Sequence, residues 1–101
     1  MMSFILQVDF PFDGPWESAM TVAMRELAES INHEPGFIWK LWTENKQQQQ
    51  AGGIYLFDSK HNAQQYLEKH SKRLQQGGVQ EIRSRIFAVN EELSTLNKAP
   101  L

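Results

Sequence analysis

The sequence predicts an α+β domain in which four β-strands and two α-helices follow one another in the order β-α-β-β-α-β. Three observations lead to this prediction. Apolar residues alternate with polar ones in strand-like segments, recur at helical spacing in two longer segments, and are separated by glycine and proline turn signals. The chain has 101 residues, enough for one domain. Aromatic residues make up 11% of it, a heavy load of large side chains for so small an interior.

The first strand and the first helix are predicted in the N-terminal third of the chain. Residues 4–10 alternate in the manner of a strand, and Pro11 ends the pattern. A turn at residues 13–15 follows, in which Pro15 suits the first position of a helix. The helix must end before Pro35, because a residue that precedes proline is driven out of the helical conformation. Its apolar positions are Met20, Met24, Leu27 and Ile31.

The second and third strands are predicted to form a hairpin. Residues 37–44 are rich in aromatic side chains, and residues 54–57 are apolar throughout. Between them, residues 45–50 contain four consecutive glutamines, which predict a solvated hairpin tip. The paired glycines at positions 52 and 53 indicate either a β-bulge or a close approach of two backbones.

The second helix is predicted to begin after the capping residues Asp58 and Ser59 and to end at Gly77-Gly78. Residues 79–89 then form the fourth strand, and residues 90–101 form a short helix or an arm. This order is typical of a ferredoxin-like sandwich. We expect one four-stranded antiparallel sheet with both helices on one of its faces.

The strands carry apolar residues on both faces, although only one face has helices to cover it. By simple alternation Phe37, Trp39 and Leu41 point one way, and Ile38 and Trp42 point the other. A contiguous apolar patch of this kind marks an interface or a ligand cavity. We therefore expect a homodimer in which two sheets face each other.

Polar residues among the aromatic strands are candidates for a pocket that binds a small molecule. The residues expected together on the uncovered face are Trp42, Tyr55 and Phe57 with their neighbours of the same parity, Lys40, Glu44 and Gly53. Gln7 and Asp9 occupy the more polar face of the first strand, as Arg83 and Arg85 do on the fourth. In the alternative interpretation, the charged residues form cross-strand salt links at a sheet edge or at the dimer contact.

Composition and motifs argue against several function classes. The net charge of −2 provides no positive field for nucleic acid or an anionic membrane, and Lys69, Lys72 and Arg73 are interpreted as a solvated helix face. The absence of cysteine excludes disulfides, thiolate catalysis and cysteine-ligated clusters. His61 and His70 are nine residues apart on one helix and fall on opposite sides, so we expect no metal site, and His70 is interpreted as a hydrogen-bonded core residue.

No glycine-rich phosphate loop and no nucleophile elbow is present, so no cofactor is expected. No apolar run approaches the length of a membrane span. The first residues lack the basic region of a signal peptide, and we therefore expect a cytoplasmic location.

The chain resembles the YdhR family of putative monooxygenases. The resemblance lies in PGFIWKLWTE at residues 35–44 and AGGIYLF at residues 51–57, and it continues through residues 66–70 and Asn90-Glu91. It implies a dimeric α/β barrel in which two ferredoxin-like subunits pack sheet to sheet. The wider superfamily includes oxygenases that act on phenols or quinols with O₂ alone, and also decarboxylases and isomerases, so the fold does not determine the reaction.

The resulting hypothesis is a cofactor-independent monooxygenase of a small aromatic or quinol-like compound, bound between sheet and helices or at the dimer interface. Such an enzyme must deprotonate its substrate, hold the anion and exclude water. The candidate catalytic residues are Asp9 as base and Arg83 and Arg85 for the anion; the candidate substrate-binding residues are Gln7, Trp39, Trp42 and Tyr55. The alternatives are a dimeric module that binds a small ligand without catalysis, and an isomerase or decarboxylase.

Overall fold

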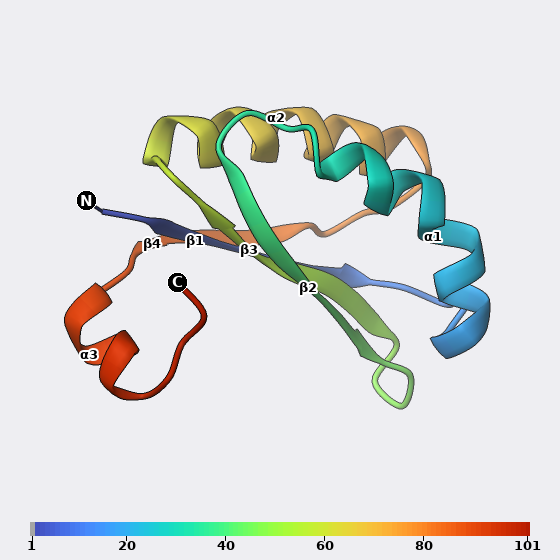
Figure 1. The fold of residues 1–101 in the computed structure, drawn as a ribbon. Helices are drawn as coiled ribbons and strands as arrows, with labels where there is room; N and C mark the ends of the chain where they lie inside the picture. The colour runs from blue at the N-terminus through green and yellow to red at the C-terminus, as the bar shows by residue number, and fades with distance from the viewer. Residues whose placement is uncertain (1) are drawn as a thin grey trace.

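The computed structural model describes residues 2–101 and has the predicted α+β, ferredoxin-like architecture (Figure 1). Its elements are β1 (Phe4–Pro11), α1 (Glu17–Ile31), β2 (Phe37–Asn45), β3 (Gln50–Phe57), α2 (Lys60–Gln76), β4 (Arg83–Ala88) and α3 (Glu91–Leu96). The four strands form one antiparallel sheet in the order β2-β3-β1-β4. Figure 1 shows α1 and α2 on one side of this sheet and α3 on the other.

Three elements start at residues other than those predicted from the sequence. α1 begins at Glu17 and not at Pro15, because Trp16 is its N-cap residue. β3 begins at Gln50 and contains both glycines, since its register with β1 pairs Gln50 with Pro11. β4 begins only at Arg83, because Val79 still belongs to the exit of α2, where its N–H donates to the Leu74 carbonyl.

The remaining turn and cap predictions are confirmed. The glutamine-rich segment is the exposed tip of the β2–β3 hairpin, where the Gln48 N–H donates to the Asn45 side chain. The Ser59 hydroxyl accepts from the Asn62 N–H at 3.1 Å and caps α2, and Gly77 ends that helix. The C-terminal segment contains both alternatives, a short helix capped by Asn90 and then an extended arm.

We call the side of the sheet covered by α1 and α2 the helix face. Leu6, Tyr55 and Phe57 are almost wholly buried there, and Tyr66 of α2 packs on the two aromatic residues of β3. Met20 and Ile31 contribute the buried side chains of α1. The core of the protein therefore lies in a single layer between the sheet and the two long helices.

A β-bulge in β2 changes which side chains share a face. Phe37 is paired with Phe57, and Trp39 is paired with Leu56, so two steps along β2 correspond to one step along β3. Phe37 consequently lies on the helix face, while Trp39 lies on the opposite face. Simple alternation had placed these two residues together, and the bulge at Ile38 is the reason why that prediction was wrong.

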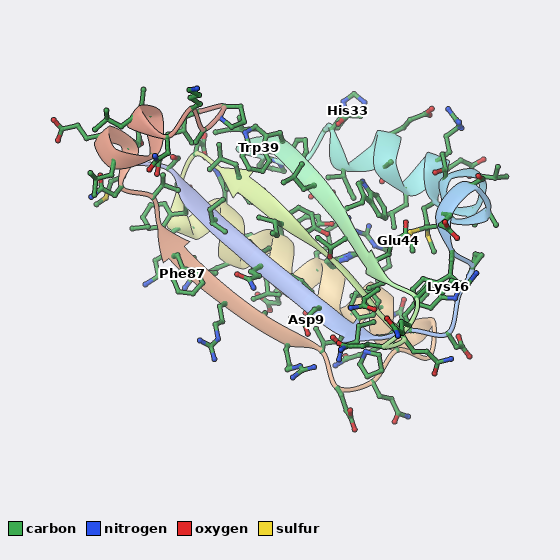
Figure 2. All side chains as sticks on the ribbon, turned by 90° about the horizontal axis from the view of Figure 1, so that it is seen from below. Asp9, His33, Trp39, Glu44, Lys46 and Phe87 are labelled. Atoms are coloured by element: carbon green, nitrogen blue, oxygen red, sulfur yellow. The ribbon has the colours of Figure 1, made fainter. Side chains whose placement is uncertain are left out.

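The opposite side of the sheet, which we call the open face, is partly covered by α3 and the C-terminal arm. The Trp39 indole N–H donates to the Pro100 carbonyl at 2.7 Å. Figure 2 views the molecule from this side, with Asp9, Trp39 and Phe87 on it. Leu41 and Phe87 remain about half exposed, at 57% and 48%. Apolar side chains thus occupy both faces of the sheet, as predicted.

The second interpretation of the paired glycines, a close backbone approach, is confirmed at Gly52. A Cβ atom at this position would clash with the Val8 carbonyl oxygen and lie 2.8 Å from the Asp9 Cα. Both atoms belong to the backbone of the neighbouring strand, so they have no room to move aside. The β1–β3 contact therefore requires glycine here.

Gly52→Ala is accordingly expected to lower the free energy of unfolding by about 1–3 kcal/mol, as overpacking does. Gly77→Ala is the matched control, because the nearest atom to its added Cβ would be the Leu74 carbonyl oxygen at an ordinary 3.5 Å. Urea denaturation measures both variants. Equal effects of the two substitutions would contradict the close-approach explanation.

Candidate functional site

A cavity of about 210 Å³ lies between the helix face of the sheet and the two long helices. α1 contributes Met20, Met24 and Leu27 to its wall, and α2 contributes His70 and Arg73. Its strand side is formed by β1, β2 and β3. A wider groove of about 600 Å³ between α1 and β2 is also lined by Met20, Met24, Lys40 and Trp42. The same side chains thus lie at the boundary between the groove and the cavity.

Lys40 lies at this boundary because of its position in β2. Alternation after the bulge places it on the helix face, opposite Tyr55. Its ammonium nitrogen is 3.3 Å from the centroid of the Trp42 ring and 4.6 Å from that of Tyr55. Glycine at position 53 makes this conformation possible, since a Cβ there would lie 2.6 Å from the Lys40 Cε.

Lys40 also has an unusual protonation equilibrium. Burial, and secondarily the positive charge of Arg73, lowers the pKa of Lys40 from 10.5 to about 7. Within residues 2–101, no carboxylate lies within 4.0 Å of its nitrogen to oppose this effect. The side chain is therefore a free amine in about half of the molecules at neutral pH, and it can accept a proton there.

Beside Lys40, α2 supplies a hydrogen-bonded group of three side chains. One terminal nitrogen of Arg73, Nη2, lies 2.8 Å from His70 Nδ1 and 3.3 Å from the Tyr66 hydroxyl. The Tyr66 hydroxyl in turn lies 3.4 Å from that of Tyr55. These residues of α2 share one face because they are four and three positions apart.

The members of this group other than Arg73 are neutral. Burial, with the charges of Arg73 and Lys40, lowers the pKa of His70 to about 3, so its ring accepts the Arg73 hydrogen bond as a neutral imidazole. Burial raises the pKa of both Tyr55 and Tyr66, and their hydroxyls stay protonated. The predicted role of His70 as a hydrogen-bonded core residue is confirmed.

The structure divides the residues predicted for the site between the two faces of the sheet. Trp42 and Tyr55 lie beside Lys40, but on the helix face, where they line the cavity. The prediction that they and Phe57 lie on the uncovered face was wrong, although the prediction that these residues share one face of the sheet was right. The reason is that both faces are apolar, so alternation alone does not show which one the helices cover.

The other predicted residues lie on the open face, away from the cavity. Gln7 and Asp9 face Arg85 and Arg83 across the β1–β4 ladder. Arg83 Nε is 3.2 Å from an Asp9 carboxylate oxygen, which is the cross-strand ion pair of the alternative interpretation. Trp39 contacts the C-terminal arm through its indole.

Glu44, expected among the pocket residues, lines the groove between α1 and β2 and also connects β2 to the start of α1. Its carboxylate accepts from the Glu17 backbone N–H at 2.8 Å. Trp16 offers no side-chain cap, so the strand supplies the acceptor that the helix N-terminus needs. This contact holds α1 next to the groove.

The role of Arg73 was missed by the sequence analysis. It was grouped with Lys69 and Lys72 on a solvated face, whereas it borders the cavity beside His70. Helical spacing from Tyr66 and His70 was the signal that could have identified it.

The described residues, 2–101, contain neither a cluster of metal-ligand side chains nor a membrane-spanning helix. No three histidine, cysteine, aspartate or glutamate side chains in residues 2–101 lie together as metal ligands would. In the same range, no helix is long and apolar enough to cross a membrane.

The fold and the site thus define the class of protein, which is an α+β sandwich with a small aromatic cavity between its layers. The family model described as "Putative mono-oxygenase ydhR" matches residues 5–100. The chain therefore belongs to the YdhR family, as its resemblance implied. No curated protein matches the chain.

The lowered pKa of Lys40 predicts a pH-dependent stability. Between pH 7 and 10.5 the unfolded chain holds a proton on Lys40 that the folded protein has lost, so wild-type stability gains up to roughly 1.4 kcal/mol per pH unit from this group. Lys40→Met lacks this gain. The unfolding free energy of Lys40→Met minus that of the wild type is therefore expected to fall between pH 7 and pH 9.

Urea denaturation at the two pH values measures this difference. Lys60→Met, at an exposed position at the start of α2, controls for the loss of one lysine. A difference for Lys40→Met that stays constant with pH would show that its amine is not desolvated in the folded protein.

Proposed function

We propose that the protein is a monooxygenase that oxidises a small aromatic compound with an ionisable ring hydroxyl, bound in the cavity between the sheet and the helices. Membership of the YdhR family supports the reaction class. The observation that carries the proposal is the Lys40 amine, which lies against the Trp42 and Tyr55 rings with no carboxylate beside it. An aromatic ring and an acidic hydroxyl are the two features that these groups would bind.

Lys40 would act first as a base. A pKa of about 7 leaves enough free amine to take the proton of a phenol, and it makes the resulting ammonium a partner for the phenolate. Trp42 and Tyr55 would stack on or against the ring. In this proposal Lys40 takes the role that the sequence analysis gave to Asp9, because Asp9 is already paired with Arg83 on the other face.

The oxidation then requires no further reductant. A phenolate with a free ring position is electron-rich enough to reduce O₂ itself. One oxygen atom bonds to the ring carbon, whose hydrogen is lost, and the other leaves as water, so that a phenol and O₂ give a quinone and H₂O. All four electrons that O₂ accepts come from the aromatic compound. The protein would supply the proton acceptor and an apolar site that excludes water.

The size of the cavity limits the substrate. Sites for drug-sized ligands occupy roughly 300–1,000 Å³, and this cavity of about 210 Å³ is smaller. One ring or two fused rings would fill it, and a larger compound would have to extend into the groove between α1 and β2.

We also propose that the protein is a homodimer, with a second copy of the chain on the open face. Leu41 and Phe87 are large apolar side chains that remain about half exposed at this surface, and Leu96 of α3 is 76% exposed. Full burial of a side chain of this size is worth about 1.5–3 kcal/mol, and the half that is still exposed accounts for about half of that. A second copy brings the same surface, and two-fold symmetry lets the two open faces cover each other.

The reaction is tested by oxygen uptake with 1-naphthol and a panel of related phenols and quinols. We expect one O₂ to be consumed per quinone formed, at a rate that rises with pH through about 7 as the Lys40 amine loses its proton. Lys40→Met is expected to lower the rate about 100-fold or more. The control Lys60→Met, on the outside of α2, should retain the wild-type rate.

Two results would contradict the proposal. Binding of these compounds without any oxygen uptake above a no-protein control would favour a non-catalytic binding protein. Conversion of a compound without oxygen uptake would favour an isomerase or a decarboxylase.

The dimer is tested by light scattering at micromolar concentration. The wild type is expected at twice 11.7 kDa, and Phe87→Glu at 11.7 kDa, because a carboxylate in the contact would be buried without a partner. Val22→Glu is the control, since Val22 is 76% exposed on α1, on the other side of the sheet. A wild-type protein found only at 11.7 kDa would disprove the dimer.

A further inference from the structure

The cavity carries positive charge without a counter-ion. Lys40 and Arg73 both line it, and none of its lining residues is an aspartate or a glutamate. Across residues 2–101, no carboxylate lies within 4.0 Å of the Arg73 side chain. The two partners that it does have, the Tyr66 hydroxyl and the His70 ring, are neutral.

Arg73 also has an unused hydrogen-bond donor. Its Nε is buried and has no hydrogen-bond partner. Buried donors of this kind are uncommon in folded proteins, and leaving one unpaired is costly. The Arg73 side chain would have to turn toward the cavity for a ligand there to supply the missing partner.

The two cations differ in how they respond to this environment. Lysine lowers the cost of burial by losing its proton, and Lys40 does so. Arginine is charged at any accessible pH. The guanidinium of Arg73 is therefore a permanent positive charge at the cavity wall, and only an anion can neutralise it.

We propose that the ligand of this cavity carries a carboxylate that pairs with Arg73, and that it is therefore a hydroxyaryl carboxylate. The hydroxyl part of this assignment rests on the proposed function, in which Lys40 receives the phenol proton. The carboxylate part rests on Arg73 alone. A carboxylate suits this residue because hydrogen bonds between a guanidinium and a carboxylate are charge-assisted and about twice as strong as those between neutral groups.

The test compares two ligands that share a ring system. The wild-type protein is titrated calorimetrically, without oxygen, with 1-naphthol and with 1-hydroxy-2-naphthoate. We expect the carboxylate to bind at least about tenfold more tightly, since hydrogen bonds to a charged partner are the stronger kind. Arg73→Gln should abolish this preference.

The matched control is Lys72→Gln, which removes the neighbouring positive charge from the exposed side of α2 and should leave the preference unchanged. Arg73→Lys keeps a positive charge but lacks the planar guanidinium. We therefore expect its carboxylate preference to be smaller than that of the wild type and larger than that of Arg73→Gln. Circular dichroism verifies that each variant is folded. The wild-type comparison needs no variant, so equal affinities for the two ligands would overturn the proposal even if Arg73→Gln does not fold.

Equal wild-type affinities for the two compounds would overturn the proposal, and so would a preference that persists in Arg73→Gln. These outcomes are separate from those of the oxygen-uptake experiment. Oxygen uptake without a carboxylate preference would refute this inference and retain the proposed reaction. A carboxylate preference that depends on Arg73, without oxygen uptake on any phenol, would support the ligand class and refute the reaction.

Discussion

The bulge at Ile38 determines on which face every later side chain of β2 lies, and most of the site depends on it. The register shift between Phe37 and Trp39 turns Lys40 and Trp42 toward the helices. Without the extra residue, their side chains would have pointed to the open face, as Trp39 does now. Glu44, four positions after Lys40, then reaches the N-terminus of α1. One irregularity in an edge strand thus positions both the amine in the cavity and the carboxylate that holds the helix beside it.

Charge in the cavity is controlled by two side chains that behave differently. Lys40 can give up its proton, because burial and the nearby positive charge of Arg73 lower its pKa. Arg73 keeps its charge and shares its hydrogen bonds with neutral partners. The histidine between them is unsuited to proton transfer at neutral pH, because the same burial and the same cations keep it unprotonated. In the proposed reaction, acid–base chemistry in the cavity therefore falls to the lysine.

The fold could be predicted from the sequence because its signals are local. Alternation, helical spacing and cap residues located the strands and the two long helices. Errors arose at boundaries that depend on strand pairing, as for Gln50 opposite Pro11, or on the hydrogen bonds at a helix end, as for Val79. The site could be predicted only in part. Tyr55 and Trp42 were predicted as binding residues and do line the cavity, but the face that they occupy was not predicted, because apolar side chains lie on both sides of the sheet. Helical spacing could have placed Arg73 beside Tyr66 and His70, but the cavity that it borders is assembled from five elements, and no local pattern shows that cavity.

The three tryptophans lie in three separate environments, so their fluorescence can report on three parts of the protein separately. Trp16 packs edge-to-face on Phe12 before α1, Trp39 touches the C-terminal arm, and Trp42 lies against the Lys40 amine. Indole emission responds to polarity and to nearby charge. Chains that retain one tryptophan at a time would therefore resolve the start of α1, the arm and the cavity as independent signals, without any label attached to this small protein.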